Sequence, residues 1–210
     1  MGIMVLIVAL ICILNFGISW WNAYVCGNVW EDSKTEGGFI RLLVWCAAIQ
    51  SALGFSSVYI IVLLLATTAL GVVEPDMVGQ LWKITLSFWY LAVIFPLLGT
   101  GLIITIHSVM EAIRRKDMLS AGIATYNTVA QVSNMYDAYQ NVGATSDVAG
   151  EAVGSLFSGG DSDDAKAKLA LLALMLVLVA VMAGAVTTYL LIQKYASTAP
   201  RVLGKGYARA

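Results

Sequence analysis

The sequence predicts an all-α integral membrane protein with four transmembrane helices and a partly helical extramembrane segment between helices three and four. Of the 210 residues, 60% are hydrophobic and only 12% are charged, and the mean hydropathy is +0.83. These values are typical of a chain that uses the bilayer as its solvent. Four windows without Asp, Glu, Lys or Arg are long enough to cross about 30 Å of hydrocarbon, which needs about 20 residues. The net charge of −1 argues against a nucleic-acid partner.

The first predicted span, residues 3–27, carries polar side chains at helical spacing. Cys12, Asn15, Ser19, Asn22 and Cys26 recur every three or four residues, so they share one helix face. An amide group in hydrocarbon without a partner costs several kcal/mol, so Asn15 and Asn22 are expected to face other helices.

The second predicted span, residues 42–70, follows a short, turn-rich connection and is therefore the antiparallel neighbour of the first. Gln50, Gly54 and Ser57 form a second polar face at helical spacing. We call the six residues of both faces the polar seam: Asn15, Ser19, Asn22, Gln50, Gly54 and Ser57. Two interpretations stay open, because such groups either bond across a helix interface or line a solvated pathway.

The third predicted span, residues 84–110, contains Pro96, followed by Gly99 and Gly101. Proline lacks the backbone donor and its ring clashes with the preceding turn, so a kink is expected. A fixed bend is expected, because proline and glycine are frequent in membrane helices, and the three residues are hinge candidates as the alternative.

A charge cluster closes the third span and completes the three-span region 1–110. It consists of His107, Glu111, Arg114, Arg115 and Lys116. The spacing lets Glu111 pair along the helix with His107 or with the arginines. We expect an interfacial anchor whose basic side chains reach the headgroups; a proton-handling pair of His107 and Glu111 is the alternative.

Residues 111–165 are predicted to be an acidic extramembrane helix and loop. Residues 117–165 include seven acidic residues and no Lys or Arg. A weak apolar stripe runs through the first part, and its partner-docking candidates are Tyr126, Val129, Tyr136 and Tyr139. Its cover is expected to be the first hairpin, a second copy or another protein. Residues 141–160 are rich in small residues and predict a loop with a short helix.

The fourth predicted span comprises residues 166–193, and a basic tail follows at residues 194–210. Gly184 and Thr188, four residues apart, fit a close helix contact. With four spans, Lys and Arg number five on the side of the termini and seven on the other side. The positive-inside rule then predicts that the acidic segment 117–165 is cytoplasmic.

The sequence offers little chemistry for catalysis. It contains no nucleotide fingerprint, no metal-ligand cluster and a single histidine, so we expect no enzyme, no cofactor and no metal site. Cys26 and Cys46 are expected to be small packing residues; a disulfide with a redox role is the alternative.

Two functions follow as expectations. The first is a non-catalytic polytopic subunit that self-associates or docks partner proteins through the extramembrane segment, with lipid and other membrane proteins as partners. The alternative is a homo-oligomeric channel or membrane sensor whose polar seam lines the pathway.

Overall fold

The computed structural model describes residues 2–35, 38–157 and 164–198, and every long element in these ranges is an α-helix. Side chains are described from Ile7 onward. The elements are α1 (Gly2–Val29), α2 (Asp32–Thr35), α3 (Gly38–Ala69), α4 (Val78–Arg115), α5 (Met118–Phe157) and α6 (Asp164–Thr198). Most of the basic tail predicted at residues 194–210 lies outside the described residues.

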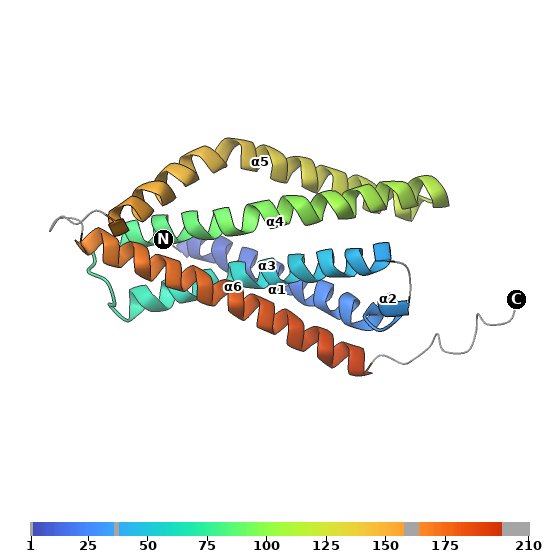
Figure 1. Cartoon of the computed structure of the whole chain (residues 1–210), viewed down its shortest axis with the longest axis horizontal. Coiled ribbons are helices and arrows are strands. Elements are labelled where there is room, and N and C mark those ends of the chain that lie inside the picture. Colours follow the sequence, from blue (N-terminus) through green and yellow to red (C-terminus); the bar gives the residue numbers. More distant parts are fainter. Residues whose placement is uncertain (1, 36–37, 158–163, 199–210) are drawn as a thin grey trace, which may run out of the picture.

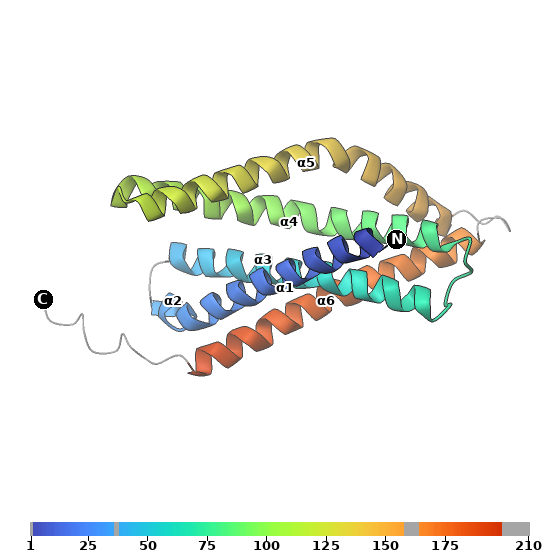
Figure 2. The same cartoon turned by 180° about the vertical axis from the view of Figure 1, so that it is seen from behind.

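The five long helices form one antiparallel bundle in which the chain alternates direction at each connection (Figure 1). Helix α3 lies at the centre and packs against α1, α4 and α6. Phe55, Leu64 and Leu81 are among the largest side chains that are fully buried there. Figures 1 and 2 both show the first turns of α1 at one end of the bundle and the last turns of α6 at the other.

Four helices are long and apolar enough to span a membrane, as the sequence predicts for a multi-pass protein. They are Ile7–Val29, Gly38–Ala69, Val78–Arg115 and Asp164–Thr198. All four exceed the length of about 20 residues that the hydrocarbon core requires.

The predicted extramembrane segment is not supported by the structure. Instead of leaving the bundle as a short helix and a loop, residues 118–157 form the 40-residue helix α5. This helix turns back and pairs with α4 (Figure 2). The prediction failed because hydropathy scores a helix residue by residue and does not show which neighbour its polar side can pack against.

A two-residue corner joins α4 to α5. Lys116 adopts the left-handed conformation (φ 54°, ψ 33°) and its amide donates to the carbonyl of Ala112, which ends α4. The carboxylate of Asp117 then accepts the amide of Ser120 at 2.7 Å and caps α5. The third predicted span therefore does not continue as an extramembrane helix.

Helices approach one another closely at several glycines. A Cβ atom built on Gly184 of α6 would overlap the backbone carbonyl of Ala52 in α3, and one on Gly27 would lie 2.5 Å from Cβ of Tyr195. Small residues of this kind allow membrane helices to pack backbone against backbone. By contrast, a Cβ on Gly99 meets nothing within 4 Å.

Small hydroxyl side chains join the central helices. Ser51 of α3 donates to the carbonyl of Ser19 in α1 at 2.8 Å and lies 3.1 Å from the hydroxyl of Thr188 in α6. Trp89 of α4 donates to the hydroxyl of Ser56 at 3.1 Å. These bonds fix α1, α4 and α6 to the central helix.

Candidate functional site

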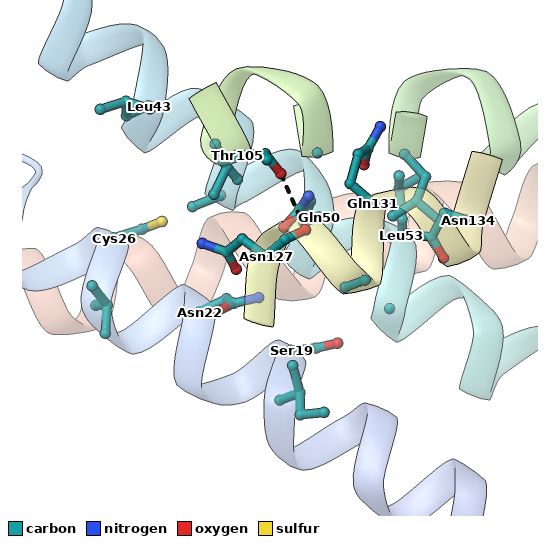
Figure 3. Close-up of a pocket in the computed structure, with 18 of the residues that line it drawn as sticks. Ser19, Asn22, Cys26, Leu43, Gln50, Leu53, Thr105, Asn127, Gln131 and Asn134 are labelled. Carbon is teal, nitrogen blue, oxygen red and sulfur yellow. Dashed lines mark hydrogen bonds between the residues drawn. The ribbon is translucent and has the colours of Figure 1, made fainter. Parts of the chain in front are cut away.

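A cavity of about 690 Å³ lies between α1, α3, α4 and α5. Its volume is within the range of small-molecule sites, about 300 to 1,000 Å³. Polar residues from all four helices line it, together with Trp89 and several aliphatic side chains (Figure 3). The polar lining consists of Asn15, Ser19, Asn22, Cys26, Gln50, Ser57, Thr105, His107, Tyr126, Asn127, Gln131 and Asn134.

All six residues of the polar seam line this cavity. The close approach that lets α1 and α3 share it occurs at Gly54, because a Cβ there would overlap the hydroxyl of Ser19. Ser57 turns its hydroxyl back to the carbonyl of Gly54 at 2.6 Å. The seam therefore lies inside a single chain, and no second copy is needed to bring its two halves together.

The amides of the seam do not bond across the helix interface. Among the described residues, no hydrogen bond joins the side chains of Asn15, Asn22 or Gln50 to another protein group. The donor that crosses from α3 to α1 is instead the hydroxyl of Ser51. In Figure 3 the side chain of Asn22 extends from α1 toward α5.

Helix α5 supplies three further amides that the sequence analysis did not identify. Asn127, Gln131 and Asn134 recur at spacings of four and three and face the cavity (Figure 3). The same spacing rule that identified the seam on the first two spans would have found them. The large apolar residues of this segment lie on another face of the helix and gave the stronger periodic pattern.

The polar face of α5 is held against α4 by two hydrogen bonds. Gln131 is buried and donates to the carbonyl of Leu98 at 3.0 Å, and Thr105 donates to the carbonyl of Asn127 at 3.2 Å. A Cβ on Gly101 would overlap the side-chain oxygen of Gln131. Gly101 thus provides the room for Gln131, whereas the side of Gly99 is open and α4 runs without a break through Pro96.

The charge cluster lies at the edge of the cavity. His107 lines it and packs edge-on against Phe39, with ring centroids 5.5 Å apart. Glu111 pairs with Arg114 at 3.2 Å and also with Arg115. The bonding partners of Glu111 are therefore the arginines, and no hydrogen bond joins it to His107 among the described residues. The interfacial anchor stays a prediction.

A second polar contact joins α4 and α5 outside the cavity. The hydroxyl of Tyr90 donates to one carboxylate oxygen of Asp137 at 2.8 Å, and the amide of Asn141 donates to the other at 2.7 Å. Asp137 is the only acidic residue between residues 118 and 146. The two bonds give each of its carboxylate oxygens a donor.

The cysteines are free thiols. Cys26 and Cys46 are both buried, and the thiol of Cys26 is 3.5 Å from the carbonyl of Val44, which it can donate to. Their surroundings fit the expected packing role.

The docking candidates point away from the bundle. Tyr126, Val129, Tyr136 and Tyr139 are 64% to 87% exposed, although Tyr126 also lines one edge of the cavity. No residue in the described ranges 2–35, 38–157 and 164–198 covers these side chains to more than about a third of their surface.

The free-energy cost of unpaired amides indicates what the cavity contains. An amide without a hydrogen-bond partner costs several kcal/mol in an apolar medium, and a domain's net stability is about 5 to 15 kcal/mol. The five cavity amides without a protein partner would use up that stability if the space were dry. Water or a polar ligand must therefore meet Asn15, Asn22, Gln50, Asn127 and Asn134.

The chemistry that this lining offers is hydrogen bonding without charge. Amides donate and accept, hydroxyls do the same, and Trp89 adds an aromatic surface. No group of three His, Cys, Asp or Glu side chains that could hold a metal ion occurs among the described residues. Comparisons with protein-family models, curated proteins and solved structures find no match to this chain.

Proposed function

We propose that the chain is a membrane protein that admits a small, uncharged polar solute into the amide-lined cavity, either as a binding site or as part of a passive pathway. The observation that carries the proposal is the set of amides from α1, α3 and α5 that face the cavity without protein partners. Groups that served only to join helices would bond to each other.

The absence of charge in the cavity lining favours uncharged solutes. The polar groups of the lining are amides, hydroxyls, a thiol and His107. Ion-coupled transporters carry acidic or basic groups at membrane depth to bind or relay the charge. A neutral solute needs only donors and acceptors.

Solute flux into proteoliposomes tests the proposal. Urea and glycerol serve as probes, and their entry is followed by light scattering after rapid mixing. The variant Asn22→Leu removes one amide and inserts an apolar side chain, so we expect at least a tenfold lower flux. Its melting temperature should stay within about 3 °C of the parent's, because Asn22 makes no protein hydrogen bond.

Asn28→Leu is the matched control, since it makes the same change on the same helix outside the cavity lining. Its flux should equal the parent's. If the parent passes neither probe above empty liposomes and neither probe raises its melting temperature, the proposal is wrong. If Asn22→Leu loses the fold instead of the flux, the amides serve as helix contacts.

A non-catalytic subunit that docks other proteins is the second candidate function. The observation in its favour is the exposed apolar face of α5, which includes Tyr136 and Tyr139. It requires that protein covers this face in the native membrane.

A further inference from the structure

The first half of α5 has its three amides on the inside and its large apolar side chains on the outside. Ala124, Gln131 and Ala138 are buried, and Asn127 and Asn134 face the cavity. The outward side chains are between 49% and 87% exposed: Leu119, Ile123, Tyr126, Val129, Val132, Tyr136 and Tyr139. A helix on a water-soluble bundle has the opposite pattern. This arrangement is the one expected when the surroundings are apolar.

The first half of α5 has the length of a membrane crossing. Residues 118–136 contain no charged residue and no histidine. At 1.5 Å per residue these 19 residues extend about 28 Å, close to the hydrocarbon thickness of about 30 Å. Three amides lower the hydropathy of this stretch, but all three point inward, where they do not meet lipid.

Three contacts place this half of α5 beside the interior of α4. Asn127 is bonded to Thr105 at 3.2 Å, Gln131 to Leu98 at 3.0 Å, and Asp137 to Tyr90 at 2.8 Å. The residue numbers of the partners on α4 fall as those on α5 rise, so the two helices are antiparallel. If α4 crosses the membrane, residues 127–137 of α5 lie at the same depth as residues 90–105 of α4.

Asp137 is compatible with that depth because both oxygens of its carboxylate accept hydrogen bonds. Tyr90 and Asn141 donate one hydrogen bond to each of its oxygens. Ionisable side chains within membrane helices are tolerated where such partners meet them.

The charges at the two ends of the bundle agree with a fifth crossing. If α5 crosses the membrane, nine of the twelve Lys and Arg residues belong to one side. They lie at the end of the bundle where α4 meets α5 and α6 ends, or they follow α6 in the sequence. These nine are Lys34, Arg41, Arg114, Arg115, Lys116, Lys194, Arg201, Lys205 and Arg209. The other end has Lys83, Lys166 and Lys168. A four-span arrangement divides them seven to five, a much weaker orientation signal.

We propose that α5 is a fifth membrane-crossing helix whose outward face is covered by lipid acyl chains, and that the corner between α4 and α5 is cytoplasmic. The start of α1 is then on the opposite side of the membrane from the end of α6. The acidic second half of α5 then extends beyond the far surface of the membrane. The inference stands on the packing of α5 and does not depend on the identity of any solute.

Spin labels on α5 test what covers it. Val129→Cys and, as a second position, Val132→Cys are labelled with a nitroxide in nanodiscs of phosphatidylcholine and phosphatidylglycerol. The three native cysteines are replaced by alanine, in a background that keeps the parent's melting temperature. Collisions with oxygen report lipid, and collisions with a water-soluble nickel chelate report solvent.

High oxygen and low nickel accessibility, matching Leu178→Cys on the outward face of α6, is the expected result. High nickel accessibility would show a solvated helix and overturn the proposal. Low accessibility to both reagents, in protein extracted with its native lipids, would show a protein cover and favour the docking function.

Cysteine labelling across the membrane tests the crossing. Met118→Cys and Phe157→Cys lie at the two ends of α5 and are 93% and 84% exposed. In sealed, oriented vesicles a membrane-impermeant maleimide should label them from opposite sides, with Met118→Cys on the cytoplasmic side. Labelling of both from the same side would restore the four-span arrangement and leave the proposed cavity function untouched.

Discussion

Ser51 and Thr85 both bury a hydroxyl group in the bundle, but only Ser51 gives its hydroxyl a partner. Ser51 bonds to the carbonyl of Ser19 and contacts Thr188, whereas the hydroxyl oxygen of Thr85 is a buried side-chain oxygen without a bond. A hydroxyl that joins three helices and one that joins nothing should differ in their effect on stability.

Substitution at Ser51 should lower stability, whereas substitution at Thr85 should not. Ser51→Ala leaves Thr188 without its partner and should lower the free energy of unfolding by about 0.6 to 2 kcal/mol. Thr85→Val keeps the shape and removes an unsatisfied group, so its stability should equal or exceed the parent's. Denaturation by increasing SDS in mixed micelles measures both. Equal losses would contradict the hydrogen-bond assignment.

At the scale of whole helices, close contact between backbones depends on glycine, which has no Cβ atom. The crossing of α3 and α6 brings the backbone of Ala52 against Gly184, and no rotation of a side chain can relieve an overlap with backbone. The crossing at Gly101 differs, because its neighbour is the end of the flexible side chain of Gln131.

Gly184→Ala should therefore lower the free energy of unfolding by about 1 to 3 kcal/mol, since overpacking forces α3 and α6 apart. Gly99→Ala adds the same methyl group where nothing lies within 4 Å. It should leave stability unchanged or raise it, because alanine favours the helix. The two variants are compared in the same SDS titration, and equal stability would contradict the close crossing.

The cap at the start of α5 should respond to acid. Hydrogen bonds from the backbone amide and then the hydroxyl of Ser120 hold the pKa of Asp117 below its usual range. Because the folded-state pKa is lower than the unfolded value of about 3.9, the cap contributes fully above that pH. Its contribution is lost as the pH falls through the folded-state pKa.

Amide exchange of the first turn of α5, corrected for the intrinsic rate at each pH, should thus lose protection as the pH falls below about 4. Asp117→Asn keeps an acceptor for the cap and cannot lose charge. It should show no change over that interval. Equal acid sensitivity in both proteins would show that another group is responsible.

At the scale of the whole molecule, the sequence contains the parts of the bundle that local patterns encode. Four apolar helices follow from hydropathy because each one is apolar along its own length. The six seam residues follow from spacing along α1 and α3. Both signals are contained within single segments.

Spacing alone groups the three amides of α5 on one face, but it does not show that this face packs against α4. Asn127, Gln131 and Asn134 lower the hydropathy of α5, and only the packing against Gly101 and Leu98 shows that they point inward. Likewise, the partners of Ser51 come from residues 32 and 137 positions away. Such contacts depend on which helices become neighbours.

The corner formed by Lys116 and Asp117 has a consequence for how the protein is made. If α5 crosses the membrane as proposed, the two residues between α4 and α5 are too few for the helices to enter the membrane separately. Helix α5, with its amides and Asp137, is too polar to partition alone, whereas α4 offers the carbonyl of Leu98 and the hydroxyl of Tyr90. The translocation machinery would then have to hold α4 until α5 has been synthesised and release the two as one hairpin.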